Sequence, residues 1–265
     1  MTYLVLILAS LWAGMQNALA GGGSFITLPS LMLTGMDARA ANITSTVALF
    51  PAQIATGLTG RSMVSGAGDL SFRALVIISL IGGALGACLL LITPPAFFAH
   101  LVPWLVLFAT GVFAYGSFVP RKEGARRLNR LGAGGAQFCI SIYGGYFGGG
   151  IGFLMLAALT AAGLAIRPAG ATKNVLAAVM NASAVLIFVF SPQVRWVAAA
   201  VASIGAITGG VLGGLMLQKV NERALRVLVI VIGIALTIGL FVRSNSAAAE
   251  TPSRTATSIS SSTTR

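Results

Sequence analysis

The sequence predicts an all-α, polytopic membrane protein made of two homologous repeats, and three observations carry this prediction. Hydrophobic residues make up 57% of the 265 positions and charged residues only 8%, with a mean hydropathy of +0.93, which no soluble core of this size requires. Apolar runs long enough to cross a bilayer of about 30 Å recur along the chain. Finally, two glycine-rich passages interrupt similar apolar stretches, one in each half of the chain.

The duplication extends well beyond the glycines Gly21–Gly23 and Gly148–Gly150. The shift along the chain that places Gly21 on Gly149 also places Phe25 on Phe153, Gly35 on Gly163, Arg39 on Arg167 and Thr44 on Thr172. A glycine break in a membrane helix frees backbone groups, which are tolerated where they line a cavity or are buried in protein. Breaks at matching positions of two halves therefore point to the binding site of a transporter.

Each half of the chain is expected to form five helical segments. In the first half they cover residues 3–20, 24–35, 42–58, 74–93 and 101–118, and in the second half 131–148, 152–163, 171–190, 197–217 and 225–242. We accordingly expect a first repeat over residues 1–119, a basic cytoplasmic linker over 120–130 and a second repeat over 131–243. Residues 244–265, rich in Ala, Ser and Thr, are predicted to be a disordered tail.

Two further sequence features concern helix packing. Gly82–Gly86 resembles Gly209–Gly213, and small residues at this spacing let two membrane helices approach closely. Pro29 in the first half is replaced by Ala157 in the second, so the two broken segments need not bend equally. For both glycine motifs, Gly82–Gly86 and Gly209–Gly213, helix packing is the favoured interpretation.

The short second segment of each half leaves two topologies open. A dozen helical residues reach only about 18 Å, roughly half of the hydrocarbon core, so this segment cannot cross alone. Segments one and two form either one broken crossing, which gives four crossings per half and parallel repeats, or a hairpin followed by three crossings, which gives inverted repeats. The hairpin places the glycine passages at its tips.

Counting basic residues favours the inverted arrangement. For this count the linker is placed on the cytoplasmic side of the membrane and the tail is left out. Inverted repeats then place twelve basic residues on the cytoplasmic side and three on the opposite side, whereas parallel repeats place nine and six. Cytoplasmic loops are enriched in Lys and Arg. The twelve are Arg61, Arg73, Arg121, Lys122, Arg126, Arg127, Arg130, Arg167, Lys173, Lys219, Arg223 and Arg226, against Arg39, Arg195 and Arg243.

Composition also excludes several classes of function. The net charge of +12 lies in short segments between apolar spans without interleaved aromatic residues, which argues against nucleic-acid binding. His100 is the only histidine, and Cys88 and Cys139 lie in apolar stretches, where we expect them to act as small core residues. The chain therefore offers no metal set, no catalytic constellation and no nucleotide-binding loop.

The motif Ala20–Pro29, with Gly35 and then Thr44-Ser45-Thr46, resembles the TauE/SafE family, also called the sulfite exporter or toluene sulfonate uptake permease family. The second half carries the matching Gly148–Gly152, Gly163 and Ala171–Asn174. The resemblance spans nearly all of the chain up to Val242. It implies an integral membrane transporter or permease, associated in many members with sulfur-containing anions such as sulfite, sulfoacetate and sulfonates.

Candidate binding residues surround the two glycine passages. Exposed backbone N–H groups and a helix N-terminus near Ser24 or Gly152 suit an anion, although glycines also permit a tight hairpin. Polar side chains are expensive to bury in such spans, which favours a functional role for them. Hydroxyl groups, however, often hydrogen bond to the backbone of their own helix. Lys173 is interpreted equally as a site residue or as a side chain at the membrane interface. The candidates are Asn17, Gly21, Gly22, Gly23, Ser24, Thr44, Ser45, Gln53, Gly149, Gly150, Gly152, Thr172, Lys173, Asn174 and Asn181.

Together these observations predict a multi-pass protein of the inner (plasma) membrane that moves a small anion by alternating access between its repeats. No cofactor and no nucleic-acid partner are expected; the partners are the lipid bilayer and the anion, and a homo-oligomer is left open. A passive channel and, with less support, a membrane enzyme are the alternatives. Asp37 with Arg39 and Asp69 with Arg73 are candidate gating pairs near the membrane edges, although solvated pairs of this kind usually contribute little.

Overall fold

The computed structural model of the chain describes residues 2–19, 21–59, 61–118 and 128–216, together with 227, 230, 231, 233–235 and 237–242. Most of the expected linker 120–130, the tail 244–265 and the basic residues Lys219, Arg223, Arg226 and Arg243 lie outside this set. The described residues are helical throughout, with short connections and no strand, so the prediction of an all-α fold is confirmed.

The described residues of the first half form five α-helices and one 3-10 turn. Their bounds are α1 Thr2–Leu19, α2 Ser24–Met32, α3 Ala38–Thr59, η1 Arg61–Met63, α4 Phe72–Ile92 and α5 Pro95–Phe118. Local chemistry sets several of these ends. The Asp37 carboxylate accepts hydrogen bonds from the backbone N–H groups of Arg39 and Ala40 at the start of α3, and the Ser71 hydroxyl accepts one from Ala74 at the start of α4.

The second half repeats this order with α6 Arg130–Tyr146, α7 Ile151–Ala161, α8 Ile166–Phe188 and α9 Trp196–Met216. The helices α6 and α8 begin at the positions equivalent to the starts of α1 and α3 under the shift that relates the two halves. Gly35 and Gly163, which occupy equivalent positions after α2 and α7, both have left-handed backbones with φ of 90° and 101°. Glycine adopts this conformation without a Cβ penalty, so it ends both short helices at the same place.

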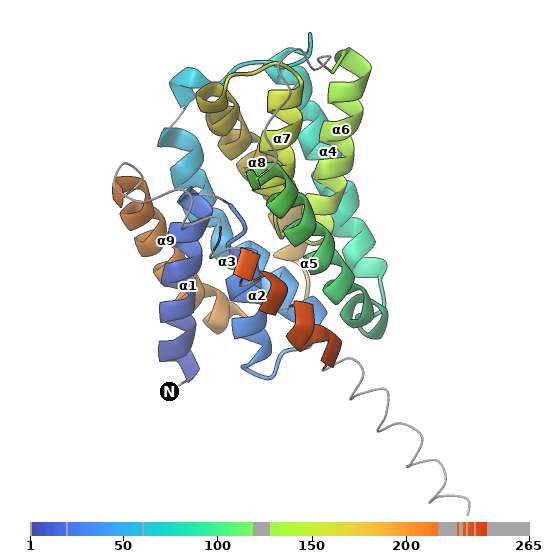
Figure 1. Cartoon of the computed structure of the whole chain (residues 1–265). Helices are drawn as coiled ribbons and strands as arrows, with labels where there is room; N and C mark the ends of the chain where they lie inside the picture. Colours follow the sequence, from blue (N-terminus) through green and yellow to red (C-terminus); the bar gives the residue numbers. More distant parts are fainter. Residues whose placement is uncertain are drawn as a thin grey trace, which may run out of the picture.

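The first two helices of each half form a hairpin, because α1 packs on α2 and α6 on α7. Figure 1 shows α1 and α2 occupying the half of the molecule that holds the N-terminus, and α6 and α7 the opposite half. We call the end with residues 61–71, 128–130 and 162–165 the linker end, where the backbone N–H of Gly68 bonds the carbonyl of Ala162 at 3.1 Å. The far end holds residues 33–37, 92–95 and 189–195, joined by Arg39 and Gln193.

The helix contacts are exchanged symmetrically between the halves. Helix α1 packs against α9 and α6 against α4, while α3 and α8 contact each other in the interior. Both outer contacts rely on small residues: a Cβ on Gly86 would overlap the carbonyl oxygen of Ile142, and one on Gly209 would overlap that of Leu11. These glycines therefore act in helix packing.

Within the described part of the chain, four helices are long and apolar enough to cross a membrane, over Phe72–Ile92, Pro95–Val112, Arg167–Phe188 and Trp196–Gly213. These correspond to the expected segments 74–93, 101–118, 171–190 and 197–217; the last expected segment, 225–242, is described only in part. Helix α3 is also long enough, at about 33 Å, but it carries many polar side chains, and they are buried: Asn42, Thr44, Ser45, Thr46 and Gln53. The protein is thus a multi-pass membrane protein whose most polar helix lies inside the bundle.

The expected core position of the cysteines is wrong. Cys88 on α4 and Cys139 on α6 are both exposed and unpaired. On helices surrounded by lipid, an exposed apolar position faces hydrocarbon, so burial within protein is not needed to accommodate a thiol there.

Candidate functional site

The two glycine passages meet inside the molecule. Gly21 and Gly150 have left-handed φ values of 86° and 75°, which turn the chain between the arms of each hairpin. A Cβ added at Gly21 would lie only 3.2 Å from the Cα of Gly152. Hairpins from opposite ends therefore touch at their tips, and the contact leaves no room for a side chain.

A small cavity lies beside this contact, with a volume of about 20 Å³. This is enough for roughly one water molecule. Six of its lining residues were predicted from the sequence and three were not. The first group is Asn17, Gly21, Gln53, Gly152, Lys173 and Asn174, and the second is Thr56, Ile151 and Ala177.

Lys173 is the charged residue of the described cavity wall and is only 6% exposed. Within the part of the chain that the structure describes, its side chain makes no hydrogen bond or ion pair. The described carboxylates, Asp37 and Asp69, are both exposed and lie at the two ends of the molecule. An ammonium buried without a counter-charge is costly, so an anion entering this cavity gains a strong partner.

Gln53 and Asn181 occupy equivalent positions of the two repeats and contact each other directly. The Asn181 amide Nδ2 donates a hydrogen bond of 2.7 Å to the Gln53 Oε1. This hydrogen bond joins α3 of the first repeat to α8 of the second repeat. The Asn181 Oδ1 has no partner among the described residues, which leaves an unsatisfied polar atom close to the cavity wall.

Three other predicted residues, Thr44, Thr172 and Ser45, form hydrogen bonds with residues distant in the sequence. Thr44 accepts a hydrogen bond from the backbone N–H of Arg195, and the equivalent Thr172 accepts one from Ser65. Each hydroxyl thereby fixes the loop that leads into the fourth helix of the other repeat. Ser45 and Thr27 share a hydrogen bond between their hydroxyls.

The remaining predicted residues belong to the hairpin tips. Gly22 accepts a hydrogen bond from the Gln16 side chain at 3.4 Å, and Gly23 one from Thr27 at 3.3 Å. Ser24 begins α2 and is half-buried. None of these three is among the residues that line the small cavity.

Aromatic rings surround Gly149, the position of the second repeat that is equivalent to Gly21. Gly149 and Gly150 lie under Phe25, whose ring atoms are 3.0 and 3.3 Å from Cβ positions built on them. The Phe147 ring also covers Gly149. The residue equivalent to Lys173 is Ser45, so the two halves provide unequal chemistry around one centre. Sequence reasoning missed both rings, because an isolated phenylalanine in a membrane segment carries no distinctive signal.

Comparison with known proteins identifies the family. The profile of the family described as sulfite exporter TauE/SafE matches residues 6–240. The chain belongs to the TauE/SafE family. A probable membrane transporter protein of Haemophilus influenzae is 29% identical over 232 residues, covering 85% of this chain and 89% of the relative.

Other relatives of this TauE/SafE protein agree. The probable membrane transporter protein YfcA of Escherichia coli is 26% identical over 249 residues, covering 91% of the chain and 90% of the relative. A probable membrane transporter protein of a Sinorhizobium species, ORF9, is 26% identical over 255 residues, covering 89% and 90%. No solved structure is significantly similar to the chain. The protein is a membrane transporter of this family, and the names of its relatives point away from an enzyme.

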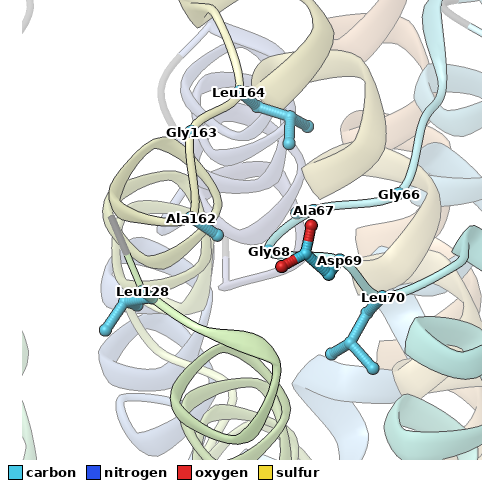
Figure 2. A pocket seen from close by; sticks show the side chains of 9 residues that line it. All are labelled: Gly66, Ala67, Gly68, Asp69, Leu70, Leu128, Ala162, Gly163 and Leu164. Atoms are coloured by element: carbon cyan, nitrogen blue, oxygen red, sulfur yellow. The ribbon is translucent and has the colours of Figure 1, made fainter. Parts of the chain in front are cut away.

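A larger cavity of about 380 Å³ lies at the linker end of the TauE/SafE protein (Figure 2). It is lined by Gly66–Leu70 together with Leu128 and the loop after α7. Gly68 and Asp69 have successive positive φ values of 58° and 60°, as in a type I′ turn. The charged side chain of its described wall is the carboxylate of Asp69, which repels anions, so this cavity is not the better candidate for anion binding.

At the far end of the TauE/SafE protein, Arg39 joins three elements. Its Nε donates to the Gln193 side chain at 3.0 Å, and Nη1 donates to the carbonyls of Leu91 and Thr93. The expected Asp37–Arg39 gating pair is not formed, because the Asp37 carboxylate caps α3 instead. The equivalent Arg167 is exposed. Arg39 therefore joins α3 to residues of both repeats at the far end, whereas its equivalent at the linker end is exposed.

Proposed function

We propose that this TauE/SafE transporter moves a small anion, a sulfur oxyanion or an organosulfonate, by alternating access around the cavity beside Gly21 and Gly152. The observation that carries the proposal is Lys173, an ammonium buried inside the helix bundle without a counter-charge in the described chain, on the wall of a cavity formed where two broken helices meet. Charged residues at such depth are expensive and tend to mark substrate pathways.

The neutral lining residues support the same ligand. The amides of Asn17, Gln53 and Asn174 offer hydrogen-bond donors to oxyanion oxygens from three different helices. These amides come from both repeats, since α1 and α3 belong to the first repeat and α8 to the second. In the proposed cycle, the anion binds when these helices come together and is released when they separate.

Alternating access is favoured by the asymmetry around the hairpin tips. The cavity lies against the linker-end halves of α3 and α8, while the far side is filled by Phe25 and Phe147 and closed by Arg39. With a volume of about 20 Å³, the cavity is too small for an oxyanion, so entry requires the helices around it to separate. We assign the linker end to the cytoplasm and the protein to the inner (plasma) membrane, because Arg61, Arg73, Arg130 and Arg167 belong to that end.

Flux into liposomes tests the proposal. Purified protein should take up labelled hydrogen sulfite or a small sulfonate with saturation, and Lys173→Ala should remove most of this uptake. Gly21→Ala should impair it as well, since the new Cβ is strained at φ of 86° and crowds Gly152. Gly35→Ala is the matched control, because it has a similar φ of 90° but open space around it.

Two results would contradict the proposal. A large ohmic current without saturation would indicate a channel, and unchanged saturable uptake in both Lys173→Ala and Gly21→Ala would remove the site. Loss of uptake in Gly35→Ala to the same extent would show that backbone strain alone, and not the contact between the tips, explains the Gly21 result.

A further inference from the structure

The described wall of the small cavity beside Gly21 and Gly152 carries a single positive charge. Lys173 is accompanied by the neutral amides of Asn17, Gln53 and Asn174. The other described basic residues belong to the two ends of the molecule: Arg39 and Arg195 to the far end, and Arg61, Arg73, Arg130 and Arg167 to the linker end. The electrostatics of the site are therefore set by one ammonium against dipoles.

A lone buried ammonium distinguishes anions by valence. A monovalent anion forms a neutral pair with Lys173, which offsets the cost of burying both charges. A divalent anion of the same size leaves one uncompensated negative charge in the cavity. Its desolvation cost is also about four times as large, because the Born energy grows with the square of the charge.

We infer that the site selects anions carrying one negative charge and rejects divalent anions of equal size. This inference rests on the proposed anion site. The amides hydrogen bond to oxyanion oxygens, while Ile151 and Ala177 give the same cavity an apolar wall. A head group of several oxygens with one charge and a small carbon substituent, as in a short alkylsulfonate, matches this lining.

Displacement of labelled methanesulfonate from the purified full-length protein tests the inference. The competitors are unlabelled methanesulfonate, perchlorate and sulfate at constant ionic strength. Sulfate and perchlorate share four oxygens in a tetrahedron and differ in charge, so they separate valence from the contribution of the methyl group. We expect methanesulfonate and perchlorate to displace the label, and sulfate to act at least roughly 100-fold more weakly.

Adding a second charge to the cavity should relax this selection. Asn174→Lys and, independently, Thr56→Lys each place another ammonium in the lining, and either should improve displacement by sulfate relative to methanesulfonate at least about 10-fold. Ser62→Lys, which adds the same charge at an exposed position of the linker end outside the cavity lining, is the control and should leave the ratio unchanged. Using two positions guards against failure of one variant to fold.

The outcomes of these measurements separate the inference from the proposed function. Sulfate competing as well as methanesulfonate in the wild-type protein would overturn the valence selection while leaving the anion site intact. An unchanged sulfate ratio in both folded charge-gain variants would do the same. Absence of saturable methanesulfonate binding to the wild-type protein, together with no displacement by any anion, would overturn the proposed site and the inference with it.

Discussion

Asn181 and Gln53, which occupy equivalent positions of the two repeats, are joined by a hydrogen bond of 2.7 Å. Both side chains are buried, and each comes from the polar third long segment of its repeat, α8 or α3. The pair therefore connects the two halves at the level of the hairpin tips. One of its members, Gln53, also lines the cavity.

Breaking this pair should destabilise the protein. Asn181→Ala leaves the Gln53 carbonyl oxygen without its donor, which should cost about 1–3 kcal/mol. The exchanged double variant Gln53→Asn with Asn181→Gln should recover part of this loss, since it restores one amide of each length at equivalent positions. Thermal unfolding in detergent measures both; equal losses in the single and exchanged variants would contradict a direct pair.

Removing the charge of Lys173 should raise stability while it removes transport. Lys173→Met keeps the length of the side chain but eliminates a buried ammonium without a counter-charge, so the melting temperature should increase. Anion uptake should fall at least about 100-fold. Thermal unfolding and liposome flux on the same preparations give both values. A Lys173→Met protein that is both less stable and inactive would instead indicate a structural partner for the ammonium.

Lys173 should also make exchange faster than net flux. Closing an empty cavity buries the lone ammonium, whereas closing a cavity that holds a monovalent anion buries a neutral pair. Unlabelled anion inside the liposomes should therefore accelerate uptake of labelled anion several-fold. The acceleration should disappear in any Lys173→Gln flux that remains. Equal rates with and without internal anion in the wild-type protein would contradict this prediction.

Arg39 should matter more for stability than its equivalent Arg167. Arg39→Ala removes hydrogen bonds to the Gln193 side chain and to two backbone carbonyls, which should cost about 1–3 kcal/mol. Arg167 is exposed, so Arg167→Ala should stay within about 0.5 kcal/mol of the parent. Chemical or thermal unfolding of the two variants compares them directly, and similar losses would argue against the far-end closure.

The glycine contacts between α4 and α6 should tolerate no added methyl group. A Cβ on Gly86 overlaps the Ile142 carbonyl oxygen, so Gly86→Ala should destabilise the protein by about 1–3 kcal/mol. Gly135→Ala in α6 is the matched control, because no atom beyond the neighbouring backbone of its own helix lies within 4 Å of a Cβ at this position and alanine favours a helix by about 1 kcal/mol. Opposite signs of the two shifts in melting temperature are expected.

The sequence was sufficient for the class of the protein, whereas the roles of the candidate site residues stay predictions. Hydropathy predicted the spans, because a bilayer demands long apolar helices. The constant offset between the two halves correctly paired Gly35 with Gly163 at two helix ends and placed Gly21, Gly152, Lys173 and Asn174 in one region. The prediction for the cysteines was wrong because apolarity alone does not distinguish a protein core from a lipid-facing surface.

By itself, the sequence determined which features the transporter contains: apolar helices, a duplicated helix break and a few polar residues that are costly to bury in a membrane. Tertiary structure decided which of these meet. Thr44 and Thr172 are bonded to loops, whereas Gln53 meets Asn181 and Lys173 is left without a described partner. The physical reason is that hydrogen bonds and burial depend on distances between helices far apart in the chain, which periodicity along one helix does not encode.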